Sequence, residues 1–132
     1  MTIRCTTETA GHARHRITIG SHEVFADLTV PEGGDDTAPG AHDYFDASLA
    51  ACKALTAIWY ARKNAMPLDG VDVEVDRDDS EERKGRYVLK LRVALRGALS
   101  AEQRERILAA IGRCPVSKLM TTSEVVIETT PS

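Results

Sequence analysis

The sequence lacks the long hydrophobic runs that mark membrane-spanning or targeting segments. Hydrophobic residues make up 42% of the 132 positions, yet no uncharged apolar run approaches the roughly 20 residues that cross a bilayer. The first residues, Met1 to Thr6, also lack the apolar stretch of a secretory signal. These absences predict a soluble, cytoplasmic protein with no membrane partner.

Basic residues are not in excess either. The chain has 17 Lys and Arg against 20 Asp and Glu, a net charge of −3, and no basic stripe of the kind that binds nucleic acid. The length predicts a single domain over residues 1–132. A domain of this size has little room to enclose a large cofactor. Residues of a second subunit could therefore be needed to complete the walls of an active site.

Cysteine is scarce, and its spacing excludes several kinds of site. A disulfide framework needs more cysteines and usually an even number of them, whereas this chain has three: Cys5, Cys52 and Cys114. No Cys-x-x-Cys is present, and the His12 and His15 pair lacks the further ligands of a zinc site. Gly33-Gly34 is not followed by a phosphate-binding motif. The sequence therefore predicts no metal and no nucleotide cofactor.

The chain begins with short β-rich runs and continues into one long helix. Residues 3–7, 16–19 and 24–28 predict an antiparallel meander, with a turn at Gly20-Ser21. The alanine-rich stretch from Asp43 to Asn64 contains neither Gly nor Pro and predicts a helix that stops before Pro67. Because this helix is apolar on nearly all sides, we expect it to be buried on most of them.

The second half predicts a hairpin, two helices and a closing strand. Apolar and mostly polar residues alternate over residues 71–76 and 89–96, which is typical of two paired strands with one solvent-exposed face. A capping box at Ser100 to Gln103 opens an amphipathic helix that ends at Gly112. Pro115 favours the start of a short helix towards Met120, and residues 125–128 are expected to form a strand. The resulting order is β-β-β-α-β-β-α-α-β.

Cys114 has the better local setting for a reactive thiol. As N-cap of the helix that Pro115 opens, it would lie beside unsatisfied backbone N–H groups and near the positive charges of Arg113 and Lys118. A half-buried thiol that happens to precede a proline fits the same pattern. Cys52 lies within the long helix among apolar neighbours, which favours an inert core thiol unless a cation reaches it from elsewhere. Arg14 and Arg16 are the nearest plausible donors, and Cys5 is assigned to packing.

Two segments nevertheless resemble the OsmC/Ohr family. Residues 39–56, which read Pro-Gly-Ala-His-Asp-Tyr-Phe-Asp-Ala-Ser-Leu-Ala-Ala-Cys-Lys-Ala-Leu-Thr, carry the first cysteine motif, and residues 114–120, which read Cys-Pro-Val-Ser-Lys-Leu-Met after a helix, carry the second. The Gly33-Gly34 loop and the order of elements fit as well. The resemblance implies an α+β fold in which antiparallel sheets wrap around long central helices in an intertwined homodimer.

The same resemblance implies a thiol-dependent peroxidase for organic hydroperoxides, with active sites at the subunit interface and a dithiol reductant as partner. Cys52 would be the peroxidatic thiol and Cys114 the resolving thiol, which reverses the order that local electrostatics favours. An arginine would stabilise the Cys52 thiolate and the leaving oxygen, and a carboxylate would orient that arginine. Arg14 is preferred over Arg16 for this role.

The family carboxylate is a Glu just before the long helix, where this sequence has His42-Asp43, so Asp43 is the candidate. Apolar residues near the thiols would suit a hydroperoxide with an apolar organic group, although any hydrophobic core needs such residues. The predicted substrate-binding residues are Phe45, Leu49, Leu55, Trp59 and Met120.

Two other functions fit the sequence. The missing Glu favours a non-enzymatic dimeric binding or stress-related protein of the same fold, with structural cysteines. A hydrolase or acyl-transfer enzyme that uses Cys114 as nucleophile and His42 as base is the third hypothesis.

Overall fold

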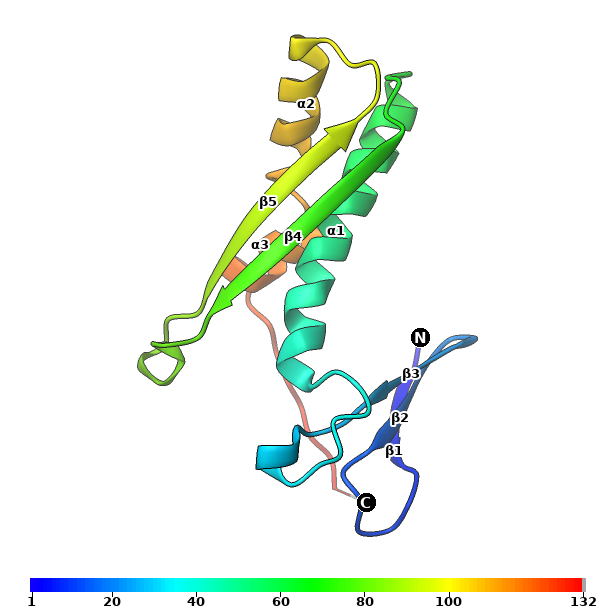
Figure 1. The fold of residues 1–132 in the computed structure, drawn as a ribbon, viewed down its shortest axis with the longest axis vertical. Helices are drawn as coiled ribbons and strands as arrows, with labels where there is room; N and C mark the ends of the chain where they lie inside the picture. Colours follow the sequence, from blue (N-terminus) through cyan, green and yellow to red (C-terminus); the bar gives the residue numbers. More distant parts are fainter. Residues whose placement is uncertain (132) are drawn as a thin grey trace. The chain divides into compact units, whose positions relative to one another are not determined.

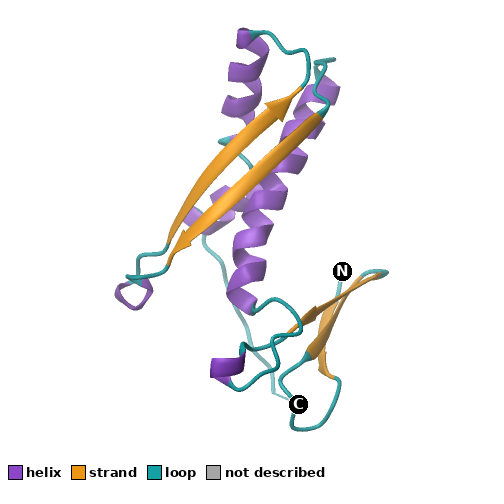
Figure 2. Cartoon of the chain, viewed as in Figure 1, coloured by secondary structure: helices purple, strands orange, loops and turns teal. Residues whose placement is uncertain are grey.

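The computed structural model describes residues 1–131 and has an α+β fold with antiparallel sheets and three α-helices (Figures 1 and 2). The chain divides into two compact units, Met1–Phe45 and a second that begins at Asp46. The single domain over residues 1–132 stays a prediction.

The first unit contains the predicted meander. Its strands β1 (Ile3–Thr7), β2 (His15–Ile19) and β3 (His22–Ala26) form one antiparallel sheet in the order β1-β2-β3. Ile19 pairs with His22 across the two-residue turn, where Gly20 has a φ of 60°, a conformation that glycine adopts without steric cost. The prediction of a small antiparallel meander is confirmed.

Asp27 anchors the loop that follows this sheet. Its buried carboxylate accepts hydrogen bonds from the Thr37 N–H at 3.0 Å, the Thr37 hydroxyl at 2.7 Å and the Leu28 N–H at 2.8 Å. These donors, the Thr37 amide first, lower the pKa of Asp27 from 3.8 to about 2 because they favour the charged form. A 3₁₀ turn, η1 (Val30–Glu32), lies within the same loop. Gly34 is needed there, since a Cβ would lie 2.2 Å from the Leu28 carbonyl oxygen.

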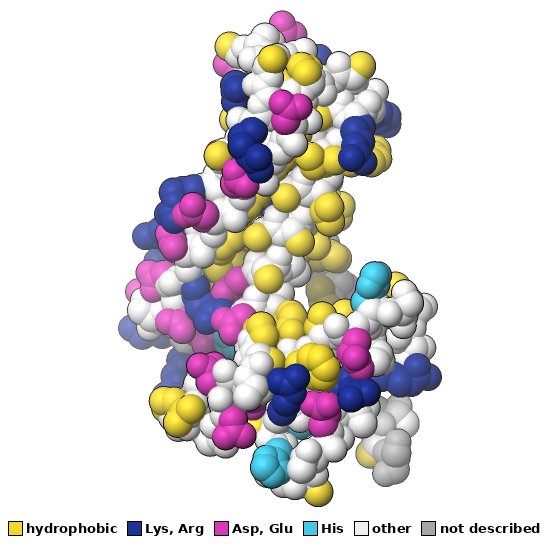
Figure 3. All heavy atoms as spheres, turned by 45° about the vertical axis from the view of Figure 1, so that its right-hand side comes forward, with side chains coloured by type: hydrophobic (Ala, Val, Ile, Leu, Met, Phe, Trp, Pro, Cys, Tyr) yellow, Lys and Arg dark blue, Asp and Glu magenta, His cyan; other side chains and the backbone are white. Residues whose placement is uncertain are grey.

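The long helix α1 spans Ala41–Lys63, close to the predicted bounds of 43 and 64. Its burial is one-sided. Leu49, Ala57 and Ala61 are buried, whereas Leu55 and Trp59 are 68% and 60% exposed. The expectation that the helix is buried on most sides is therefore wrong for the single chain, because no described residue of the second unit (46–131) covers that face. Figure 3 shows hydrophobic side chains gathered on the surface over the middle of α1.

The second unit packs a hairpin and two helices against α1. Strands β4 (Gly70–Asp78) and β5 (Val88–Arg96) pair antiparallel, and the 3₁₀ turn η2 (Glu82–Lys84) lies in their connection. Helix α2 (Ala101–Ile111) begins with the predicted capping box, and α3 (Pro115–Thr121) follows with Cys114 as its N-cap. The hairpin, the capping box and the proline-led short helix were thus predicted correctly.

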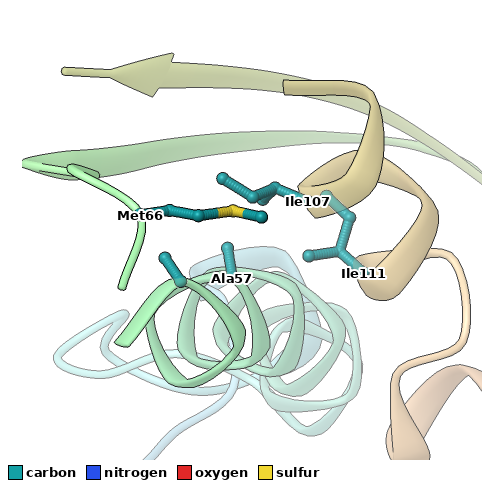
Figure 4. Close-up of a cluster of buried hydrophobic side chains, with 5 residues drawn as sticks. Ala57, Met66, Ile107 and Ile111 are labelled. Carbon is teal, nitrogen blue, oxygen red and sulfur yellow. The ribbon is translucent and has the colours of Figure 1, made fainter. Parts of the chain in front are cut away.

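The core of this unit lies between α1, α2 and the hairpin (Figure 4). Ala57 and Ala61 present small side chains on the inner face of α1, so the larger side chains of Met66, Ile107 and Ile111 can approach the helix closely. Ile107 is fully buried. Partly buried side chains extend this cluster: Tyr60, Leu68, Val71, Val93, Leu95 and Leu99.

One buried carboxylate, Asp46, ties the first turns of α1 to the far end of the hairpin. It accepts a hydrogen bond from Arg77 Nε at 2.5 Å and another from the Tyr87 hydroxyl at 2.8 Å. Burial raises the pKa of Tyr87 to about 12, and the bond to Asp46 acts in the same direction. This network fixes the register of the hairpin along the helix.

The expected closing strand does not form. Residues 125–128 have no regular secondary structure, and Val125, Val126 and Ile127 are more than 60% exposed. Alternation of residue types can specify the face of a strand, but a strand also needs a partner for its backbone groups, and none of the described strands pairs with this segment. Within residues 1–131, no helix is long and apolar enough to span a membrane.

Candidate functional site

Cys52 and Cys114 lie together in the second unit. Cys52 comes from the middle of α1 and is partly buried, whereas Cys114 is fully buried at the junction of α2 and α3. The Cys52 thiol is among the groups that lower the pKa of Cys114, so the two side chains are near neighbours. Thr56, one helical turn beyond Cys52, places its hydroxyl 3.9 Å from the Cys52 sulfur. Two side chains 62 positions apart in the sequence therefore share one site.

The environment of Cys114 favours its thiolate. Burial alone would raise the pKa of this thiol, but the Ser117 N–H, the Cys52 thiol and the Lys53 ammonium together outweigh burial, so the pKa is lowered. The sulfur makes no cap hydrogen bond of regular geometry, and the Ser117 amide is still near enough to favour the negative charge. The positive charge of Lys53 favours the negative charge on this sulfur.

Lys53 is held in place by a backbone carbonyl. Its ammonium donates a hydrogen bond of 2.7 Å to the carbonyl oxygen of Ile111, the last residue of α2. The final carbonyls of a helix lack partners within that helix and carry partial negative charge, so a cation is favoured there. The end of α2 therefore fixes the ammonium beside Cys114.

A groove of about 1050 Å³ opens beside the thiols and is lined mostly by apolar side chains. Cys52, Leu55 and Trp59 from α1 form one wall, and Pro115 and Val116 from α3 contribute to the other. Three cationic residues also line the groove: Lys63, Arg113 and Lys118. Cys52 thus meets the groove, while Cys114 lies behind it.

Two of the predicted substrate-binding residues line this groove, Leu55 and Trp59. Leu49 is buried, 6% exposed, and lies outside the lining, as does Met120. Phe45 belongs to the first unit. The role of all five in substrate binding stays a prediction.

The two arginines of the first unit are paired with carboxylates there. Arg14 donates to Glu8 at 2.9 Å and to the Thr37 hydroxyl at 2.9 Å, and it stacks over the Phe25 ring at 4.1 Å. Arg16 donates to Glu8 at 3.1 Å. Hydrogen bonds from Arg16 and then Arg14 lower the pKa of Glu8. One carboxylate therefore orients both guanidinium groups.

Asp43 has a local role at the start of α1, where its carboxylate accepts a hydrogen bond from the Gly40 N–H at 2.8 Å. His42 precedes it on the same helix. The roles predicted for Arg14, Arg16, Asp43 and His42 remain predictions, since these residues and the thiols belong to different units.

Two side chains that neighbour the predicted site residues could not be found from the sequence alone. Lys53, and not Arg113 or Lys118, is the cation that lowers the pKa of Cys114. Its position next to Cys52 in the sequence was the only signal. Glu8 was missed because its carboxylate meets Arg14 and Arg16 only through the pairing of β1 with β2. Residues 1–131 contain no cluster of three or more His, Cys, Asp or Glu that could hold a metal ion.

One family matches the chain in a comparison with models of known protein families. The family model described as OsmC-like protein matches residues 33–130. None of the curated protein sequences compared with the chain matches it.

Several solved structures have a similar fold. One, from Psychrobacter arcticus 273-4, bears the provisional name osmotic stress induced and detoxification response protein; it is 21% identical, with a TM-score of 0.78 over 92% of this chain and 89% of its own. An OsmC-like protein from Mycoplasma pneumoniae is 15% identical, with a TM-score of 0.71 over 92% and 87%. An organic hydroperoxide resistance protein from Elizabethkingia anophelis is 19% identical, with a TM-score of 0.61 over 92% and 89%.

Proposed function

The chain belongs to the OsmC-like protein family, and we propose that it is a cysteine-based peroxidase that reduces organic hydroperoxides. The observation that carries the proposal is the arrangement of the two thiols. Cys52 lines an apolar groove, and Cys114 lies behind it, near enough for the Cys52 thiol to lower its pKa. The name of the Elizabethkingia anophelis structure, an organic hydroperoxide resistance protein, supports the choice of substrate.

The proposed cycle needs only these two thiols and an external dithiol reductant. The Cys52 thiolate attacks the distal oxygen of the hydroperoxide, the O–O bond breaks, and the alkoxide leaves and takes up a proton to give the alcohol. Cys52 is then a sulfenic acid. Cys114 attacks its sulfur, water leaves, and a disulfide forms. A dithiol reduces this disulfide and restores both thiols.

The depth of each thiol supports this assignment of roles. A peroxidatic thiol must meet its substrate, and Cys52 does so at the groove. A resolving thiol has to reach only the other sulfur, which suits the fully buried Cys114. The same burial weighs against the acyl-transfer hypothesis, in which Cys114 would attack a substrate with His42 as base.

An arginine is still required beside Cys52. Arg14, or else Arg16, is our candidate, with Asp43 as the proposed orienting carboxylate. Glu8 already orients both guanidinium groups within the first unit, so it is an additional candidate for that role. The arginine would stabilise the Cys52 thiolate and the departing alkoxide.

We further propose that the protein works as a homodimer in the cytoplasm, with its active sites at the subunit interface. Two observations support a partner chain. Large apolar side chains, Leu55 and Trp59, stand exposed on α1, which is unusual for a monomer. The same two side chains line the groove at Cys52, so a second chain placed there would help to enclose the substrate.

The groove also supports the alternative of a dimeric binding protein with structural cysteines. An apolar cavity of about 1050 Å³ is large enough for a small ligand. In that case Cys52 would stay reduced when a hydroperoxide is added.

Disulfide mapping separates the two functions. The reduced protein is treated with one equivalent of cumene hydroperoxide, and the products are identified by mass spectrometry. We expect a Cys52–Cys114 disulfide in the wild type and in the control Cys5→Ser, a dimedone-trapped sulfenic acid at Cys52 in Cys114→Ser, and no fast reaction in Cys52→Ser. Peroxide consumption no faster than that of free cysteine would favour the binding protein.

A further inference from the structure

Lys53 is a partly buried cation placed at the resolving thiol. It follows Cys52 in the sequence, and its side chain extends to the end of α2 and to Cys114. Burial of an ammonium is costly unless its N–H groups find acceptors. The Ile111 carbonyl oxygen takes one of them at 2.7 Å. The Cys114 N–H donates to the same oxygen at 3.2 Å, so the ammonium lies beside Cys114, and its charge lowers the pKa of that thiol.

A neutral thiol is a poor acceptor for an ammonium, whereas a thiolate is a strong one. The ammonium and the buried sulfur therefore satisfy each other best when the sulfur is charged. Since the Ile111 carbonyl fixes the position of Lys53 independently of the sulfur, the cation is preorganised and does not have to be ordered during the reaction.

We propose that Lys53 is a catalytic residue of the resolving step, which keeps Cys114 as the thiolate that attacks the oxidised Cys52. This inference rests on the peroxidase function proposed above and deepens it, because it assigns the second half of the cycle to a side chain outside the predicted site residues.

In that step the Cys114 thiolate forms a bond to the Cys52 sulfur, and the S–O bond of the sulfenic acid breaks. The hydroxide that leaves takes up a proton and becomes water. Cys52 is reduced from sulfenic acid to disulfide, and Cys114 is oxidised from thiolate to disulfide. Lys53 loses its anionic partner in the product but keeps the Ile111 carbonyl.

The other charged groups around the groove are less suited to this role. Arg113 and Lys118 line it and are exposed, so water screens their effect on a buried sulfur. The Lys63 ammonium contacts the Trp59 ring instead, at 4.8 Å from the ring centre. The neutral donors that face Cys114 are the Cys52 thiol and the Ser117 amide, and both favour the thiolate together with Lys53.

The first test measures the charge on Cys114 without any peroxide. In a Cys5→Ser/Cys52→Ser background, thiolate absorbance at 240 nm is followed against pH. Replacing Lys53 by Met keeps most of the side-chain length but removes the charge, and we expect about a tenfold loss of thiolate at a given pH below the midpoint. Lys53→Arg should retain most of it. Lys90→Met, which removes an exposed cation of β5 outside the groove lining, is the matched control and should leave the midpoint unchanged.

The second test follows the resolving step in chains that keep both thiols. After one equivalent of hydroperoxide, the Cys52 sulfenic acid should persist about tenfold longer in Lys53→Met than in the wild type or in Lys90→Met. Circular dichroism checks that each variant is folded, and Lys53→Arg serves as the folded comparison should Lys53→Met unfold. An unchanged midpoint, or a shifted midpoint with an unchanged resolving rate, would overturn the role of Lys53.

Failure of the proposed peroxidase function gives a different result from failure of the role of Lys53. If no sulfenic acid forms in any variant, the peroxidase proposal falls. The same result overturns the resolving role of Lys53, while the absorbance midpoints still show whether Lys53 holds the charge on Cys114.

Discussion

The two units of the chain are stabilised by different means. All the buried hydrophobic side chains among residues 1–131 belong to the second unit, from Leu49 to Cys114. The first unit, Met1–Phe45, buries only the polar Asp27. Polar contacts hold it instead: the Asp27 carboxylate with Thr37, Glu8 with two arginines, and the Tyr44 hydroxyl with the Phe25 carbonyl.

The difference indicates which unit depends on further contacts. Hydrophobic burial is the main favourable term in folding, and a three-stranded sheet needs an apolar face packed against something to be stable. The second unit has its own core, whereas the first does not. We therefore expect the first unit to gain much of its stability from surfaces that the single chain leaves exposed, as an intertwined dimer would provide.

The largest expected effect is on the core of the second unit. Ile107 is fully buried among Ala57, Met66 and Ile111, so Ile107→Ala should lower the free energy of unfolding by about 2–5 kcal/mol. Urea unfolding followed by circular dichroism measures this change. The matched variant is Ile3→Ala in β1, where the side chain is 60% exposed, and its effect should stay within about 0.5 kcal/mol for the monomeric chain. Equal losses in both variants would contradict the contrast between the units.

A somewhat smaller effect is expected on assembly. Leu55→Asp places a charge in the exposed apolar stripe of α1. Burial of a leucine contributes about 1.5–3 kcal/mol, and a two-fold interface contains the position twice. The dissociation constant of the proposed dimer should therefore rise at least about 100-fold. Sedimentation at several concentrations measures this. Leu108→Asp is the control, since Leu108 is 45% exposed on α2 and should leave assembly unchanged. A wild type that stays at 14.4 kDa at every concentration would contradict the dimer.

Most of the secondary structure could be predicted from the sequence because it depends on local signals. The capping box at Ser100 and the proline after Cys114 fix the starts of α2 and α3, and the alternation in β4 and β5 gives the hairpin. Residues 125–128 show the limit of such signals. Their alternation is typical of a strand, but pairing depends on a partner outside the segment.

The site was predictable only in part, for a similar reason. The two cysteines were found through their motifs, and both lie in one place. The proximity of Lys53 to Cys114 was not predicted. The helical pattern of α1 does not show whether the Lys53 side chain points to solvent or towards the end of α2. Glu8 was missed because strand pairing, and not sequence distance, brings it to Arg14 and Arg16.

The smallest expected effect is local to the polar network of the first unit. Three hydrogen bonds to Asp27 favour its carboxylate, and its pKa of about 2 lies below the ordinary 3.8. The folded state therefore binds fewer protons than the unfolded state at intermediate pH. The stability that Asp27 contributes is fully present above pH 3.8 and is lost as the pH falls towards 2.

Two amides report this titration directly, because the Leu28 and Thr37 N–H groups donate to the Asp27 carboxylate. Their nitrogen-15 chemical shifts, measured while the sheet remains folded, should move with a midpoint near pH 2. Asp27→Asn should abolish the titration and weaken the loop, since an amide side chain turns one of its two acceptor groups into a donor that faces other donors. A midpoint near 3.8 would mean that the hydrogen bonds do not favour the charged form, and the first unit would then lack the polar anchor that we assign to it.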